Sequence, residues 1–163
     1  AWKHIETEKP DAKLTVAGDG PERNNLEKLA SKLQLENVNF EGWVSERRKR
    51  ELYEEAAIYA LPTLYEGFGL SNLEAMASGC AVSSTNTWGV RDYIDDGENG
   101  FLVPTRDSAS LANAIIGLLS DTELIAQLAA EGRKTAEQYS IRDSVEKEVE
   151  IIEEIYRGTR QSV

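Results

Sequence analysis

Short apolar runs alternate with longer segments of helical periodicity along most of the chain. A short apolar run bounded by turn residues predicts a buried strand, and apolar residues every third or fourth position predict an amphipathic helix. The predicted strands are Lys13 to Ala17, Val38 to Glu41, Ile58 to Leu61, Ala81 to Ser84 and Phe101 to Val103. Strands that alternate with helices predict an α/β, Rossmann-like three-layer domain with a parallel sheet and helices on both faces.

Helix boundaries are marked by residues that favour caps. Ser45, Ser108, Asp121 and Ser140 are expected N-caps, because their side-chain oxygens can accept a bond from free N–H groups of the first turn. The predicted helices are Glu22 to Leu33, one from Ser45 to about Glu55, Leu70 to Ala77, and three that begin at Ser108, Asp121 and Ser140. Gly79 suits the left-handed position after a helix. The segment Ala1 to Ile5 resembles the body of a helix without a cap, which indicates that the chain begins within an element.

Composition narrows the class of protein. The 163 residues carry a net charge of −11, which disfavours nucleic acid as a partner. No apolar run approaches the roughly 20 residues of a membrane span, so we expect a soluble domain. The chain has one cysteine, Cys80, so it cannot form an internal disulfide, which fits the reducing cytoplasm. The apolar residues next to Cys80 predict that its side chain is buried.

The tightest basic cluster is Arg47 to Arg50. Consecutive residues of a helix point around most of its circumference, so a solvated helix face with a Glu46–Arg50 pair is the simpler interpretation. The alternative is a peripheral contact with an anionic membrane, at its inner, cytoplasmic face, near a lipid-linked acceptor.

The most informative stretch, Leu61 to Ala77, joins a predicted strand to a predicted helix. Ligands of open α/β sheets lie beyond the carboxyl ends of the strands, where free N–H groups of the next helix favour an anion. Gly67 and Gly69 lack a Cβ, so the backbone from Phe68 to Ser71 can approach phosphate or sugar oxygens closely. A diphosphate would fit this place.

Two glutamates flank the same stretch. Glu66 precedes the glycines and Glu74 follows about one helical turn inside the helix. Ionised carboxylates only accept hydrogen bonds, so hydroxyl-rich partners suit them.

These motifs resemble the donor-site signature of glycosyltransferase family 4 and its relatives with the GT-B fold. Glu66 and Glu74, with seven residues between them, match the two glutamates of that signature. Further pieces in the same order are Gly18-Asp19-Gly20-Pro21, Phe40-Glu41-Gly42, Glu66-Gly67-Phe68-Gly69-Leu70, Glu74-Ala75-Met76-Ala77, Gly79, Asp96-Gly97 and Gly100-Phe101-Leu102-Val103. The resemblance covers nearly the whole chain.

The resemblance implies a retaining glycosyltransferase whose donor is a UDP-, GDP- or ADP-sugar and which needs no divalent metal. Glu66 would act at the transferred sugar as the catalytic residue, and Glu74 would bind the ribose hydroxyls. The donor-binding residues it implies are Gly18, Gly20, Trp43, Val44, Glu66, Gly67, Phe68, Gly69, Leu70, Ser71 and Glu74.

Three departures from the family pattern concern function. An arginine and a lysine that usually hold the diphosphate would precede Ala1, together with the first strand of the sheet. The resemblance therefore makes residues 1–163 the carboxyl-terminal donor half, without the amino-terminal domain that binds the sugar or lipid-linked acceptor, and inactive alone. The alternative is a non-catalytic module that binds a nucleotide sugar and works with a separate acceptor subunit. Finally, Trp88-Gly89-Val90-Arg91-Asp92 stands where many relatives have a double glycine.

Other sites are less well supported by the residues. A nicotinamide-binding pattern fails because its third glycine would fall at Arg23. Asp95 and Asp96 lie among glycines that predict a tight turn, with no histidine nearby for a metal site. His4, the only histidine, is expected to be exposed and without a role.

Overall fold

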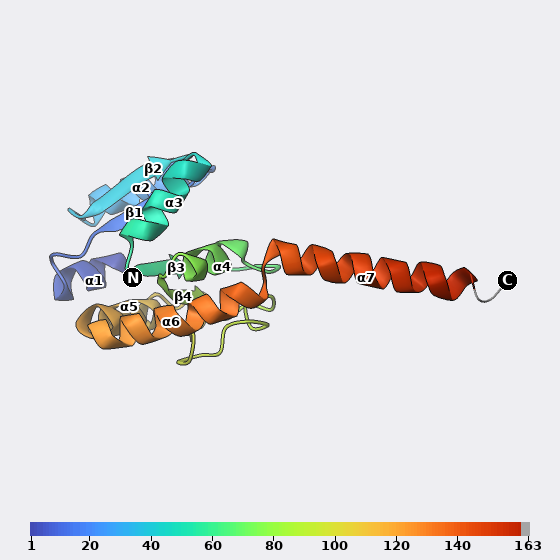
Figure 1. Ribbon diagram of the computed structural model, residues 1–163. Coiled ribbons are helices and arrows are strands. Elements are labelled where there is room, and N and C mark those ends of the chain that lie inside the picture. The colour runs from blue at the N-terminus through green and yellow to red at the C-terminus, as the bar shows by residue number, and fades with distance from the viewer. Residues whose placement is uncertain (161–163) are drawn as a thin grey trace.

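The computed structural model describes residues 1–160 and contains parallel strands flanked by helices (Figure 1). Strand β1 (Leu14–Ala17) pairs with β2 (Val38–Gly42), and β3 (Ile58–Leu61) pairs with β4 (Ala81–Thr85), which also pairs with β5 (Phe101–Val103). The α/β prediction is therefore confirmed. The strands form two sheets, of two and three strands, and not the single sheet that we expected. The sheets are separate because β1 does not pair with β3 within residues 1–160.

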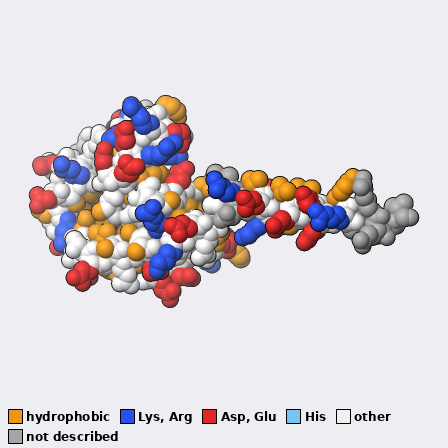
Figure 2. Space-filling model, viewed as in Figure 1, with side chains coloured by type: hydrophobic (Ala, Val, Ile, Leu, Met, Phe, Trp, Pro, Cys, Tyr) orange, Lys and Arg blue, Asp and Glu red, His pale blue; other side chains and the backbone are white. Residues whose placement is uncertain are grey.

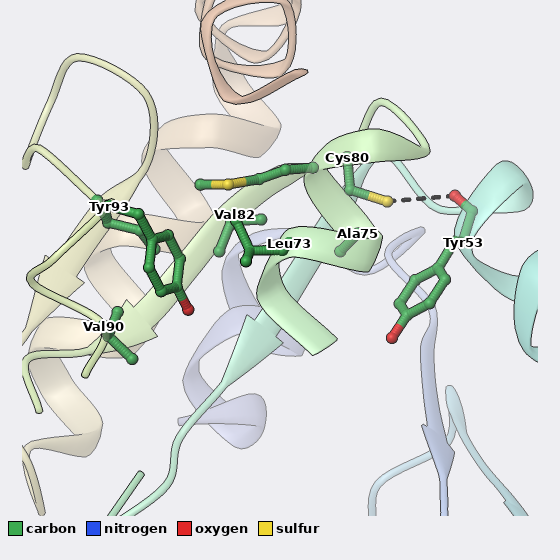
Figure 3. Close-up of a cluster of buried hydrophobic side chains, with 9 residues drawn as sticks. Tyr53, Leu73, Ala75, Cys80, Val82, Val90 and Tyr93 are labelled. Carbon is green, nitrogen blue, oxygen red and sulfur yellow. Dashed lines mark hydrogen bonds between the residues drawn. The ribbon is translucent and has the colours of Figure 1, made fainter. Parts of the chain in front are cut away.

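Strand β4 forms the centre of the larger sheet, and all five of its residues are buried. Successive side chains of a strand point to opposite faces. Ala81 packs with Leu118 and Leu128 on one face. Val82 belongs to the cluster on the other face, with Leu73 and Ala75 (Figure 3). Helices therefore cover both faces of this sheet, as an apolar strand in a parallel sheet requires.

Seven helices surround and extend these sheets in the described chain. Their bounds are α1 (Trp2–Glu8), α2 (Arg23–Lys32), α3 (Glu46–Glu55), α4 (Leu70–Ala77), α5 (Ser108–Ser120), α6 (Thr122–Gln138) and α7 (Ile141–Arg160). Ser45 and Asp121 cap α3 and α6 as predicted. Gly79 has φ +89°, and the Cys80 N–H bonds to the Ala75 carbonyl at 3.0 Å, which confirms the predicted left-handed end of α4.

Two local predictions are wrong. Asp107, not Ser108, caps α5, because the Asp107 carboxylate accepts bonds from the N–H groups of Ala109 and Ser110 at 3.1 and 2.9 Å. On α3, Glu46 pairs with Lys49 at 3.0 Å and not with Arg50.

The molecule has two parts and a projecting helix (Figure 1). The β1–β2 sheet with α2 and α3 lies on one side of β3, β4 and their helices, and α7 extends away from both. Side chains along α7 that are half to two-thirds exposed form an apolar series interrupted by charges (Figure 2): Val145, Val149, Ile151, Ile152, Ile155 and Tyr156.

Among residues 1–160, no single helix has both the length and the apolar composition to cross a membrane. Helices α5 and α6 meet that requirement only as a pair, and they bend by 106° where they join.

Candidate functional site

The loops after β1 and β2 lie together, as parallel pairing of these strands requires. The Gly18 N–H donates to the Gly42 carbonyl at 2.7 Å, and both glycines have positive φ, at +125° and +71°. The side chain of Asp19 accepts a bond from the Gly20 N–H at 2.8 Å. Trp43, which follows Gly42, is 79% exposed, so its indole is open to a ligand.

The loop from β3 to α4 presents free backbone donors. Gly69 is the N-cap of α4 with φ +81°, and no side chain caps this helix. Within the described chain, the N–H groups of residues 68 to 71 have no hydrogen-bond acceptor. These donors point to an anion or sugar oxygens as partners, because a helix N-terminus carries partial positive charge. Glu66 lies beside them and accepts a bond from the Gly67 N–H at 3.1 Å.

Buried polar side chains hold this loop on its inner side. Tyr93 donates its hydroxyl to the Gly69 carbonyl at 3.1 Å, and Asn72 Nδ2 donates to the Tyr93 oxygen at 3.1 Å. Burial raises the pKa of Tyr93 to about 12, so the hydroxyl remains a donor at neutral pH. The Phe68 ring packs 5.4 Å from the Tyr93 ring and 5.7 Å from that of Tyr139. The loop therefore anchors its aromatic side chain inward while its N–H groups stay free.

A second loop packs directly against the first. A Cβ added at Gly89 would lie 1.8 Å from the Gly67 carbonyl oxygen and 2.8 Å from the Phe68 Cα. No side chain fits between these backbones, so the glycine at position 89 is required by close approach.

The carboxylate of Glu74 is held by two residues of α3. Lys49 Nζ lies 2.9 Å from Glu74 Oε1, and the Tyr53 hydroxyl donates to Glu74 Oε2 at 3.2 Å. The hydrogen bond to Glu74 is the main cause that raises the pKa of Lys49, and burial raises the pKa of Tyr53. Both groups are therefore protonated at neutral pH and fix a carboxylate that is itself 44% exposed.

The predicted site residues thus occupy two neighbouring places. Glu66, Glu74 and the backbone from Gly67 to Ser71 lie at the carboxyl end of β3, while Gly18, Gly20, Trp43 and Val44 lie at those of β1 and β2. Helix α3 links the two, because it begins two residues after Val44 and holds Glu74. The sequence did not reveal the contributions of Lys49, Tyr53, Asn72 and Tyr93, whose partners lie 18 to 25 residues away along the chain.

Most of the basic cluster is neutralised. Arg48 contacts Glu41 at 2.7 Å and also reaches Glu51 and Glu55, and these bonds raise its pKa. Lys49 contacts Glu46 and Glu74. This pattern favours the solvated helix face over a basic patch for anionic lipids.

The aspartates near residue 95 form a turn. Asp96 Oδ1 accepts a bond from the Leu102 N–H at 2.9 Å, and the Gly97 N–H donates to the Gly100 carbonyl at 2.8 Å. The predicted tight turn is confirmed. Across residues 1–160, no group of three or more His, Cys, Asp or Glu side chains is placed to hold a metal ion.

Free N–H groups and carboxylates at the carboxyl ends of parallel strands are typical of α/β proteins that bind a phosphate-bearing ligand at that edge. The model of the family "Glycosyl transferases group 1" matches residues 1–135, so the chain belongs to that family. It is 37% identical to EpsD of Bacillus subtilis over 143 residues. This alignment covers 87% of this chain and 37% of EpsD. It spans 22% to 41% of the length of the curated relatives that match first.

Solved structures share the fold. The carboxyl-terminal domain of the group 1 glycosyl transferase LpcC from Francisella tularensis is 29% identical, with a TM-score of 0.77, over 86% of this chain and 78% of that one. Anabaena HepE in complex with UDP is 25% identical, with a TM-score of 0.83, over 93% of this chain and 43% of HepE.

Proposed function

We propose that this chain is the donor-binding, carboxyl-terminal half of a retaining glycosyltransferase. The observation that carries the proposal is the group of free N–H donors at residues 68 to 71, with Glu66 and Glu74 beside them. The donors suit a diphosphate, and the carboxylates suit sugar and ribose hydroxyls. The UDP bound to HepE and the match to the carboxyl-terminal domain of LpcC support this assignment.

In this proposal each group of residues binds a different part of the donor. Glu74, held by Lys49 and Tyr53, binds the ribose, and the backbone from Phe68 to Ser71 binds the diphosphate and sugar oxygens. Negative charge that develops on the leaving diphosphate is stabilised by donors already in place. Glu66 acts at the transferred sugar, and the loops near Gly18 to Gly20 and Trp43 to Val44 lie along the base.

The rest of the polypeptide supplies the acceptor site in this proposal. Within residues 1–160, β1 and β3 each pair on one side only, which leaves room for one further strand of the polypeptide to join the two sheets. An acceptor domain with a sugar or lipid-linked acceptor would cover the donor and pack on α7. The reaction takes place in the cytoplasm, proceeds with retention and uses no divalent metal.

Calorimetric titration of this chain with UDP, GDP and ADP tests the donor site. We expect one nucleotide to bind with a Kd between micromolar and millimolar. Glu74→Ala should weaken it roughly 10- to 100-fold, because a hydrogen bond to a charged group contributes about 1.5 to 3 kcal/mol.

Glu54→Ala is the matched control, since Glu54 is an exposed glutamate of α3. Folded protein that binds none of the three nucleotides, or a Glu74→Ala variant that binds like Glu54→Ala, would contradict the proposed site.

A further inference from the structure

Two hydrogen bonds hold the Gly69 carbonyl on the inner side of the β3–α4 loop. The Tyr93 hydroxyl donates to it at 3.1 Å, and the Asn72 N–H donates to it at 2.9 Å. A peptide unit is planar and trans, so its C=O and its N–H point in opposite directions. Because the Gly69 carbonyl points inward, the Leu70 N–H of the same peptide points outward, where it has no acceptor within residues 1–160.

The side chain of Asn72 decides where the Tyr93 hydroxyl donates. Asn72 Nδ2 donates to the Tyr93 oxygen at 3.1 Å and to the Ser84 hydroxyl at 3.1 Å. The Tyr93 oxygen therefore already accepts a bond, and its single proton is left for the Gly69 carbonyl. Asn72 and Ser84 are fully buried and Tyr93 is 4% exposed, so water does not compete for these bonds.

Gly69 admits the Tyr93 hydroxyl and also leaves the backbone free to rotate. Its φ is +81°, and a Cβ at this position would lie 2.7 Å from the Tyr93 hydroxyl. A glycine therefore leaves the space that the hydroxyl occupies. The same lack of a side chain lets the Gly69–Leu70 peptide turn over, which would point the Leu70 N–H inward. The Tyr93 bond opposes this rotation, because the bond is lost when the carbonyl turns.

The ring of Tyr93 is held independently of its hydroxyl. It packs 5.4 Å from the Phe68 ring and 5.8 Å from the Tyr139 ring. The Tyr93 carbonyl also accepts a bond from Asn99 Nδ2 at 2.8 Å. Removal of the hydroxyl alone should therefore leave the ring and its surroundings in place, which separates the orientation of the peptide from the packing of the core.

We propose that Tyr93 is a positioning residue for the diphosphate of the donor. Its hydroxyl holds the Gly69–Leu70 peptide so that the Leu70 N–H faces a phosphate oxygen before the ligand binds. The proposal rests on the proposed function for the identity of the ligand. A hydrogen-bond donor that is oriented in advance needs no reorganisation when the ligand arrives. Tyr93 thus strengthens diphosphate binding through the peptide and not by direct contact.

Tyr93→Phe removes the hydroxyl and keeps the ring. Titrations followed by ¹H–¹⁵N NMR compare UDP, GDP and ADP with the matching nucleosides, which have the same base and ribose but no phosphate. For the diphosphate that binds, we expect Tyr93→Phe to weaken affinity roughly three- to thirtyfold. The affinity for its nucleoside should change less than about twofold, because the Leu70 N–H contacts only phosphate. A purely structural role of the hydroxyl would weaken both ligands alike.

Tyr139→Phe is the matched control. It removes a hydroxyl from the same aromatic cluster, but this hydroxyl donates to the Asp92 carbonyl at 3.1 Å and not to the β3–α4 loop. It should change neither affinity by more than about twofold. A measurement on the parent chain needs no variant: the bound diphosphate should shift the Leu70 amide signal.

Three results would overturn the role of Tyr93 alone. They are a Leu70 signal that the bound diphosphate does not move, equal diphosphate affinity of Tyr93→Phe and Tyr139→Phe, and equal losses for the diphosphate and its nucleoside. Folded parent chain that binds none of the three diphosphates would contradict the proposed function and overturn the role of Tyr93 with it.

Discussion

At the scale of single residues, Gly89 fixes the distance between the two loops of the site. The nearest atom to a Cβ at this position would be a backbone carbonyl oxygen at 1.8 Å, which cannot move aside as a flexible side chain would. We predict that Gly89→Ala lowers stability by about 1 to 3 kcal/mol, as overpacking does, and lowers Tm by several degrees.

Gly117→Ala is the control for Gly89→Ala. A Cβ at Gly117, within α5, would meet no atom within 4 Å, so this change should raise stability by about 0.5 to 1 kcal/mol. Calorimetric melts of both variants check the pair. Equal Tm values for Gly89→Ala and the parent chain would contradict the close approach of the loops.

The buried thiol of Cys80 makes the unfolding free energy depend on pH in the alkaline range. Its thiol donates to the Tyr53 carbonyl at 3.2 Å (Figure 3), and burial raises its pKa to about 11 from 9.0. The unfolded chain therefore loses this proton first, so the contribution of Cys80 is complete below pH 9 and declines as pH rises toward 11.

Denaturant titrations at pH 8 and pH 10 measure this effect. The loss of unfolding free energy between the two pH values should be about 1 kcal/mol smaller in Cys80→Ala than in the parent chain. The buried tyrosines contribute equally to the loss in both proteins, so their contribution cancels when the two losses are compared. Equal losses would show that the thiol is not buried in solution.

At the scale of elements, α7 exposes apolar side chains where α6 buries one. Val149 and Ile152 are 49% and 65% exposed, whereas Leu128 on α6 is fully buried. We predict that Val149→Gln with Ile152→Gln changes unfolding free energy by less than about 0.5 kcal/mol, as exposed substitutions do. Leu128→Gln should lower it by several kcal/mol. Thermal melts that rank these variants the other way would place the α7 face in contact with the body of the molecule.

The elements themselves could be predicted because their signals are local. Strand and helix bounds follow from apolar periodicity and from caps such as Ser45, Asp121 and Gly79, which need only neighbouring residues. Asp107 and Ser108 show the limit of this approach. Two adjacent residues can both cap a helix, and in the structure Asp107 takes this role, directly after Arg106, whose φ is +61°.

At the scale of the whole molecule, the two sheets differ in how far their strands are buried from solvent. All residues of β4 are buried, whereas those of β1 alternate between intermediate and exposed. Hydrogen exchange followed by mass spectrometry should therefore show much faster exchange in β1 than in β4. Equal protection of both strands would mean that the sheets unfold together as one unit.

Only part of the site followed from the sequence at this scale. The motif around Glu66 and Glu74 is continuous and could be recognised, and its position at the end of β3 follows from the strand–loop–helix order. The Lys49–Glu74 pair and the division into two sheets depend on strand order and on contacts between distant segments. A local pattern of polar and apolar residues carries no information on either.

The unpaired edges of β1 and β3 have a consequence for handling the protein. Each edge presents N–H and C=O groups without a neighbouring strand within residues 1–160. Such edges recruit extended segments of other chains and begin aggregation. Concentrated samples of this chain should therefore lose monomer over time through growth at these edges, and a peptide strand that caps one of them should extend the shelf life of the preparation.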